Sequence, residues 1–425
     1  MRKLKWKSAV LILSALGIVG TSPAQMNNTD SSVPGTAGTN AAQTSALESP
    51  SSVPAAMTLA SSAPQKNWTD YVTVKGDMRL REEVINDDSK KKSDGEHYTR
   101  DRLRIRARLG AEAKLDDLKA GIRISTGGAD PISGNATLGD GDQKKEIRLD
   151  LAYLDYGFIN DDAYGLNVIG GKMKNPLINY GNDDLVWDSD LTPEGLAAKA
   201  RGGNEWVAFL ANAEYLYIKD RNSQPNAWAW VGQGALQFTF VPEAALTLGA
   251  AYLGFQNFEG YDVIDWENNN NSYGNSTKKG TVSGSTTNKA WACEFTPIMG
   301  FGNLDLFLGK VPVSIYGQAL SNPGADDNNK GYMGGISLFK AKNPKSFEFG
   351  YAYAKLEKDA VLGMWTDSDR WGGGTDGKGS RFYGKYQLTK YLQFGVTFFL
   401  DKKYIADNET ESSYNRLQVD LQGAF

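Results

Sequence analysis

Apolar and polar residues alternate with a period of two from Trp68 to the end of the chain. The clearest stretch reads, in order, Arg102, Leu103, Arg104, Ile105, Arg106, Ala107, Arg108 and Leu109. Successive side chains of a β-strand point to opposite faces, so this period is typical of a strand with one apolar and one polar face. The pattern therefore predicts an all-β protein.

The same alternation, followed along the chain, predicts sixteen strands. Their approximate bounds are 70–85, 97–113, 118–127, 145–158, 164–174, 193–201, 205–218, 227–240, 245–258, 289–298, 310–320, 331–341, 346–357, 379–388, 391–402 and 413–425. Short connections, such as 115–117 and 202–204, alternate with long polar ones at 128–144, 175–192, 259–288 and 358–378. Outer-membrane barrels have short periplasmic turns, longer external loops and an even strand number. We expect residues 68–425 to form a transmembrane antiparallel up-and-down β-barrel.

The apolar face that recurs on nearly every strand has to be covered. A soluble all-β protein with a polar outside is the alternative, but a sixteen-stranded sheet closed on itself exposes that face to lipid. About ten residues, rising ~3.3 Å each and tilted by ~40°, span the ~25 Å apolar band of an outer membrane. The negative mean hydropathy fits this arrangement, because only alternate residues of a barrel face lipid.

Residues 1–24 have the layout of a secretory signal peptide. The basic start MRKLKWK is followed by an apolar run from Ala9 to Gly20 and by the small-residue site Ser22-Pro23-Ala24. We expect export through the Sec pathway to the outer membrane of a Gram-negative-type bacterium, with cleavage after Ala24. A retained anchor is the alternative, but this run is well short of the ~20 residues that cross a bilayer. Cleavage removes four basic residues and no acidic one, so the formal charge of −4 becomes −8.

Residues 25–67 are rich in Ser, Thr, Ala, Pro and Asn and contain no aromatic residue. Such a segment cannot bury a core, so we predict a disordered periplasmic linker. Its role is that of a passive spacer or of a tether to the cell wall.

The composition leaves little material for catalysis. The chain has one cysteine, Cys293, so it cannot form an internal disulfide. With a single histidine, His97, as well, metal sites and nucleophilic triads are disfavoured. We expect no catalytic cycle, no metal and no cofactor. An outer-membrane enzyme, which needs an activated nucleophile beside a base, and an adhesin that binds through its long polar loops are the alternatives from other classes.

The alternating arginines are the first candidate functional residues. An arginine facing lipid near the bilayer midplane costs roughly 2–4 kcal/mol, so the four at 102–109 are expected to face a water-filled lumen. Other basic residues at strand positions extend this set to a pore-lining wall: Arg79, Arg81, Arg102, Arg104, Arg106, Arg108, Arg123, Arg148, Lys172 and Lys174. The alternative is that they pair with Asp77, Glu82 or Asp150 and only brace the barrel. Export and the acidic net charge disfavour nucleic acid as a partner.

A second candidate is the acidic segment that follows Lys174. It carries Asp183, Asp184, Asp188, Asp190 and Glu194 around Trp187. The strand end GKMKNP and the stretch WDSDLTPEG resemble the bacterial "putative porin" family, over nearly all of residues 68–425. The resemblance implies a sixteen-stranded porin, usually a homotrimer, whose loop at 175–192 folds inward and narrows the channel.

Opposite charges across a narrow gap would create a transverse field that orients dipolar solutes and selects ions. We therefore predict passive diffusion of small hydrophilic solutes and ions, with a porin selective for phosphate or other anions as the alternative. The loop aspartates are otherwise solvated, or bind calcium, although no ligand spacing for calcium is recognisable.

The C-terminus suggests how the barrel is assembled. Leu417, Val419, Leu421 and Phe425 share one face of a final strand that ends in an aromatic residue. This ending resembles the signature that barrel-assembly machinery binds during insertion into outer-membrane lipid. Gly423 departs from it, because an aromatic residue is common at that position.

Overall fold

The computed structural model describes residues 67–93, 95–181, 185–222, 224–266, 271–282, 285–406 and 410–425. The expected signal peptide and residues 25–66 of the expected linker lie outside the described residues, as do Asp183 and Asp184. The compact unit Thr69–Phe425 holds all the strands that the structure describes.

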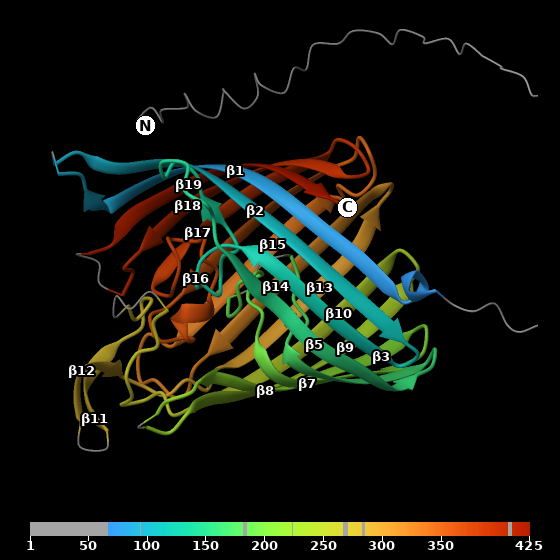
Figure 1. Cartoon of the computed structure of the whole chain (residues 1–425), viewed down its shortest axis with the longest axis horizontal. Helices are drawn as coiled ribbons and strands as arrows, with labels where there is room; N and C mark the ends of the chain where they lie inside the picture. The colour runs from blue at the N-terminus through green and yellow to red at the C-terminus, as the bar shows by residue number, and fades with distance from the viewer. Residues whose placement is uncertain are drawn as a thin grey trace, which may run out of the picture. The chain divides into compact units, whose positions relative to one another are not determined.

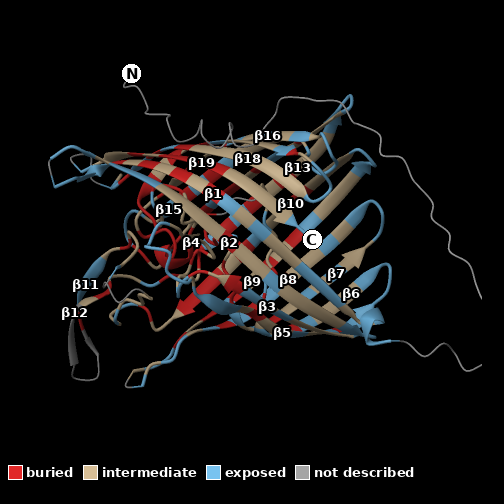
Figure 2. Cartoon of the chain, turned by 45° about the horizontal axis from the view of Figure 1, so that its top comes forward, coloured by how far each residue is buried: buried red, intermediate tan, exposed pale blue. Residues whose placement is uncertain are grey.

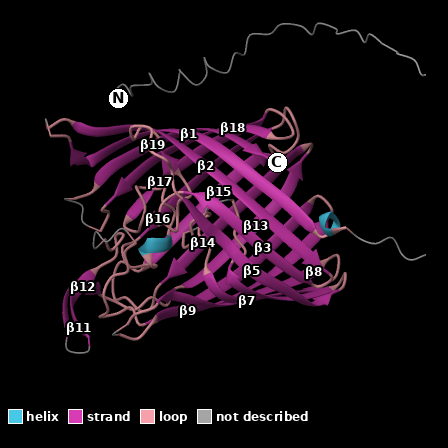
Figure 3. Ribbon diagram, viewed as in Figure 1, coloured by secondary structure: helices cyan, strands magenta, loops and turns pink. Residues whose placement is uncertain are grey.

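Sixteen long strands form the barrel (Figures 1 and 3). They are β1 (Val72–Lys91), β2 (His97–Leu115), β3 (Leu118–Thr126), β5 (Ile147–Asn160), β6 (Tyr164–Lys172), β7 (Glu194–Gly203), β8 (Val207–Lys219), β9 (Ala227–Val241), β10 (Ala244–Gln256), β13 (Ile298–Leu308), β14 (Val311–Ser321), β15 (Lys330–Phe339), β16 (Phe347–Leu356), β17 (Gly377–Gln387), β18 (Leu392–Lys403) and β19 (Ser412–Ala424). The short β4 (Ala136–Thr137) pairs with β2, and β11 (Thr277–Val282) and β12 (Ser285–Trp291) form a separate hairpin. The short 3-10 helices are η1 (Trp68–Asp70) and η2 (Gly363–Trp365).

The first and last strands close the sheet. Each barrel strand pairs antiparallel with its neighbours, and β1 also pairs with β19, where Asp77 lies opposite Ala424 and Asp87 opposite Tyr414. A closed sheet has no free edge, so all its strands satisfy their backbone hydrogen bonds within the protein, as a lipid environment demands. The predicted fold class, an antiparallel barrel of sixteen strands, is confirmed.

The two faces of the strands differ in polarity. On β1, the side chains of Met78 and Leu80 are exposed on the outside, whereas Arg81 and Glu83 are buried inside. In Figure 2 buried residues are concentrated in the part of the barrel nearest the β11–β12 hairpin, and most residues in the other part are exposed or intermediate. Within the described residues, no helix is long and apolar enough to cross a bilayer.

The two ends of the barrel carry different connections. Residues 116–117, 161–163, 204–206, 242–243 and 309–310 make short turns. The long connections span 127–146, 173–193, 257–297 and 357–376. In Figure 1 the β11–β12 hairpin lies at the end with the long connections, and η1 lies at the opposite end.

The tenth predicted strand was misplaced. Residues 289–298 were expected to be a barrel strand, but 289–291 belong to the β11–β12 hairpin and the tenth barrel strand is β13. The alternation of Trp291, Cys293 and Phe295 misled the prediction, because Trp291 and Phe295 are buried among the long connections. In β13 the outward positions Gly300 and Gly302 carry no apolar side chain, so the period of two is hard to detect there.

The inner surface of the barrel is divided into two halves. Buried apolar side chains line β8, β9, β10, β13 and β16, including Leu216, Val231, Leu253, Met299 and Leu356. They belong to one apolar cluster that also takes in residues of the long connections. By contrast, the inner faces of β1, β2 and β19 are charged, so the two halves of the lumen offer different surfaces.

Candidate functional site

A ladder of arginines runs along the inner faces of β1, β2 and β19. In the antiparallel register Arg79 lies opposite Arg106, and Arg81 lies opposite Arg104. Asp77 and Glu83 of β1 lie opposite Arg108 and Arg102 of β2 on the same face. Residues directly opposite each other share a face of the sheet, so all these side chains point into the barrel, away from Leu80 and Ile105.

Carboxylates of the wall itself pair with most of this ladder. Glu83, whose side chain has 0% exposure, lies 2.5 Å from Arg102, 2.8 Å from Arg416 and 3.6 Å from Arg104. Asp420 accepts two hydrogen bonds from Arg81, at 2.7 and 2.8 Å. Most ladder arginines therefore have a carboxylate partner within the wall, which is the arrangement that the bracing alternative described.

Two of the three expected bracing partners pair with arginines. Asp77 lies 2.8 Å from Arg108, and Asp150 lies 2.5 Å from Arg123. Glu82 occupies the opposite face of β1, because its neighbours Arg81 and Glu83 both point inward.

Arg79 is different from the other ladder residues. Among the described residues, Arg79 donates one hydrogen bond, to the amide oxygen of Asn135 at 2.8 Å. Its Nε is buried without a described partner, and no carboxylate lies within ion-pair distance in the described chain. Arg79 therefore lacks, in the described chain, the close carboxylate partner that the other ladder arginines have.

The β6–β7 connection, residues 173–193, brings Asp190 to the ladder. The Asp190 carboxylate accepts hydrogen bonds from Arg106 at 2.8 and 3.1 Å, and lies 3.4 Å from Arg108. Burial by itself would raise the pKa of Asp190, but the guanidinium groups of Arg106, Arg79 and Arg108 outweigh it and lower that pKa. Asp190 is therefore a charged partner of the wall.

Asp188 of the same connection has a different environment. Its carboxylate accepts the backbone N–H of Asp190 at 2.8 Å and that of Ser368 at 2.9 Å. Burial, followed by the neighbouring carboxylates of Asp367 and Asp190, raises the pKa of Asp188 well above its usual range. Asp188 thus joins two segments of backbone, and none of its hydrogen bonds among the described residues involves an arginine.

The remaining predicted residues are not brought to this cluster. Lys172 pairs with Glu194 at 2.9 Å across β6 and β7, on the outward face that also carries Val168 and Leu196. Arg148 is half-exposed and pairs with Glu146 at 2.6 Å. Lys174 lies beside Arg108 and Arg123 in a separate cavity.

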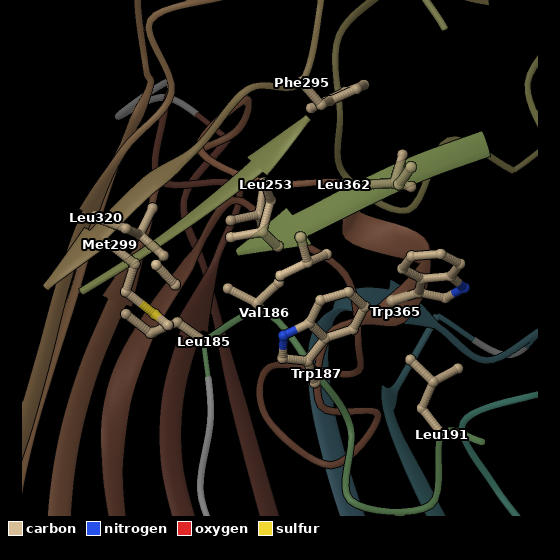
Figure 4. Close-up of a cluster of buried hydrophobic side chains, with 14 of the residues drawn as sticks. Leu185, Val186, Trp187, Leu191, Leu253, Phe295, Met299, Leu320, Leu362 and Trp365 are labelled. Atoms are coloured by element: carbon tan, nitrogen blue, oxygen red, sulfur yellow. The ribbon is translucent and has the colours of Figure 1, made fainter. Parts of the chain in front are cut away.

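A second long connection contributes residues that the sequence analysis missed. In the β16–β17 connection, residues 357–376, Asp369 lies 3.1 Å from Arg81 and 3.0 Å from Arg416. The ring of Trp365 stacks on that of Trp187, with centroids 5.3 Å apart and an angle of 29° between the planes (Figure 4). The sequence did hold a signal: Asp367-Ser368-Asp369 after Trp365 repeats the pattern of Asp188-Ser189-Asp190 after Trp187.

Two cavities flank the β6–β7 connection. One, of about 230 Å³, is lined by Arg79, Arg81, Asp190 and Asp369, among others. The other, of about 360 Å³, is lined by Arg108, Arg123 and Lys174. Trp187, Asp188 and Ser189 line both cavities, so this short stretch separates them. No cluster of three or more metal-ligating side chains occurs among the described residues.

Comparison with known proteins agrees with the resemblance found in the sequence. Residues 87–282 match the family model described as "Putative porin", which confirms the resemblance over that range, including the β6–β7 connection. No curated protein matches the chain.

Among solved structures, OprB of Pseudomonas putida is 12% identical, with a TM-score of 0.50, and the match covers 84% of this chain and 95% of that one. OmpT of Vibrio cholerae, an outer membrane protein in a trimer form, is 12% identical with a TM-score of 0.45, over 84% of this chain and 100% of that one. The OprB likeness supports the barrel fold, and the family match supports a channel of the porin type.

Proposed function

We propose that the chain is an outer-membrane porin through which small hydrophilic solutes and ions diffuse passively, with no catalytic cycle and no cofactor. The observation that carries this proposal is the contact of Asp190 with Arg106. Asp190 follows β6 in the chain, while Arg106 lies on β2. In the sheet, β3 and β5 separate β2 from β6. The β6–β7 connection therefore reaches a distant part of the wall.

Further contacts support the proposal that this connection folds into the lumen. The side chain of Gln233 on β9 hydrogen-bonds the backbone N–H and C=O of Ile178, at 2.7 and 3.1 Å. Gln318 on β14 accepts the N–H of Leu185 at 3.3 Å, and Arg381 on β17 donates to the carbonyl of Gly181 at 3.1 Å. Contacts with β9, β14, β17 and β2 are expected of a segment that crosses the barrel interior.

In the proposed channel, solutes pass beside the ladder, through the cavity that Arg79, Arg81, Asp190 and Asp369 help to line. Ordered charges of both signs around a narrow passage produce a local electric field, which favours hydrated ions and dipolar solutes over apolar ones. Most ladder arginines already pair with wall carboxylates such as Glu83 and Asp420, and this favours a general channel over a phosphate-binding one.

Several features of the proposed biology rest on the sequence. We infer Sec-dependent export, insertion into outer-membrane lipid by barrel-assembly machinery and association as a homotrimer. An acidic net charge does not favour nucleic acid as a partner.

Ion selectivity of the purified full chain in a planar lipid bilayer tests this proposal. The wild type should conduct, and replacing Arg104 and Arg106 together by Ser should shift the reversal potential in a salt gradient toward cation preference, because two fixed positive charges leave the passage. Arg221→Ser, in the β8–β9 connection, removes a positive charge away from the ladder and serves as the control. A wild-type protein that conducts no ions would contradict the channel; an unchanged reversal potential would contradict the placement of the ladder.

A further inference from the structure

We propose that the β16–β17 connection is a second constriction segment, interlocked with the β6–β7 connection, and that its Asp369 helps to determine ion selectivity. This inference rests on the proposed channel function. It adds to the pore a segment that lies far from the first one in sequence and outside the range that matches the family model.

The two connections are joined through both side chains and backbone. Besides the stacked rings of Trp187 and Trp365, the backbone N–H of Asp188 donates to the carbonyl of Trp365 at 2.7 Å. The N–H of Ser368 returns a hydrogen bond to the Asp188 carboxylate at 2.9 Å. We call this set of contacts the clasp.

Asp369 is held against the ladder next to the position of Asp190. Its carboxylate contacts Arg81 and Arg416, and Arg416 also donates to the backbone carbonyls of Ser368 and Asp369, at 3.0 and 3.2 Å. Burial acts to raise the pKa of Asp369, but Arg416 and Arg81 outweigh it and lower that pKa, so the group is ionised at neutral pH. Asp190 and Asp369 line the same cavity, so both carboxylates act on a solute there.

A third connection supports the second one from behind. In the β10–β13 connection, Asn275 donates to the carbonyls of Lys358 and Val361, at 2.7 and 2.8 Å, and accepts the N–H of Gly363 at 2.7 Å. A side chain at Gly363 would have its Cβ 2.2 Å from the carbonyl oxygen of Tyr273, so only glycine fits. The β16–β17 connection is thus held between the β10–β13 connection and the clasp, which fixes where Asp369 lies.

The selectivity role is tested with Asp369→Asn, which keeps the size of the side chain and removes its charge. The reversal potential in a salt gradient should shift toward anion preference, because Arg81 and Arg416 lose one counter-charge while Glu83 and Asp420 remain. Asp327→Asn, an exposed aspartate of the β14–β15 connection, makes the same change of charge away from the ladder and should leave the potential unchanged. If Asp369→Asn conducts with the selectivity of the wild type, Asp369 has no such role.

The clasp is tested separately, by hydrogen exchange of the peptide that contains residues 185–191. Trp365→Ala should accelerate this exchange, and adding Trp187→Ala should accelerate it little further, because both substitutions remove the same contact. Trp365→Phe keeps an aromatic ring at this position, so it shows whether the faster exchange in Trp365→Ala reflects a general loss of folding. Trp206→Ala removes an exposed tryptophan at a turn and is the control for the loss of a tryptophan elsewhere. Unchanged exchange in Trp365→Ala, or additive effects of the two substitutions, would overturn the clasp.

These measurements separate the two proposals. A wild-type protein without conductance would overturn the channel and the selectivity role of Asp369 with it. Hydrogen exchange does not depend on conductance, so it decides whether the two connections are interlocked in either case.

Discussion

The two halves of the barrel interior carry different kinds of side chain. The half formed by β8, β9, β10, β13 and β16 is lined by buried apolar side chains that pack on the long connections, as an ordinary protein core does. The half formed by β1, β2 and β19 is lined by ion pairs with Glu83 at their centre. In the proposed channel, a passage for hydrated solutes needs a polar wall, whereas connections that fold inward need an apolar surface to hold them. The division of the lumen meets both needs at once.

The largest expected effect comes from breaking the charged half. Glu83→Ala leaves Arg102, Arg104 and Arg416 without their shared carboxylate, and removing one partner of a buried ion pair costs about 3–5 kcal/mol. The free energy of unfolding of the refolded barrel, measured in urea with lipid vesicles, should fall by that amount. Glu194→Ala, which breaks an exposed pair with Lys172, should cost no more than about 1 kcal/mol. Equal losses for the two variants would show that Glu83 does not organise the wall.

The apolar half is tested by Leu253→Ala. Leu253 is fully buried beneath the long connections, and removing such a side chain costs about 2–5 kcal/mol because a cavity remains. The same urea titration should show a clearly smaller loss for Leu236→Ala, since Leu236 faces outward on β9 and lipid replaces the removed atoms. The apolar half would not act as a core if the two substitutions cost the same.

A smaller effect should distinguish the two aspartates of the β6–β7 connection by pH. The raised pKa of Asp188 means that its contribution to stability is present below about pH 4, the value of an unperturbed aspartate, and is lost as pH rises through the raised pKa. Asp190 has a lowered pKa, so its contribution is present above about pH 4 and is lost as pH falls toward the lowered value. Hydrogen exchange of residues 185–191 in the wild type should therefore become faster as pH rises above 4, after correction for intrinsic exchange.

Asp188→Asn removes the group that ionises on raising the pH, so this rise in exchange should disappear. Asp190→Asn should keep the rise, because Asp188 is still present. If both variants retain the pH dependence of the wild type, a group other than Asp188 controls the clasp.

The barrel could be predicted because apolar and polar residues alternate with a period of two within each single strand. Alternation around Leu103 and Arg104 is a local property, so fifteen of the sixteen strands were expected close to where they lie, and only β13, with glycines at outward positions, was misplaced. The same alternation placed Arg102, Arg104, Arg106 and Arg108 on one face, and the structure has them there.

The contacts of the connections could not be predicted in this way. Asp190 and Arg106 are 84 residues apart, and Arg81 and Asp369 are 288 apart, so their meeting depends on closure of the whole sheet. From its composition and its lack of alternation, the sequence of the β16–β17 connection predicts only a polar loop, although Trp365 and Trp371 are buried in it. A Trp followed closely by Asp-Ser-Asp occurs in both segments, and this recurrence was the one available indication that they are related.

The pairing of β1 with β19 has a consequence for the order of events during biogenesis. Arg81 with Asp420 and Glu83 with Arg416 are bonds between the first and last strands of the barrel. The polar wall of the pore is thus completed at the seam, when the two ends of the polypeptide meet. The wall of paired charges is therefore incomplete until β1 meets β19, so the step that closes the cylinder also completes this wall.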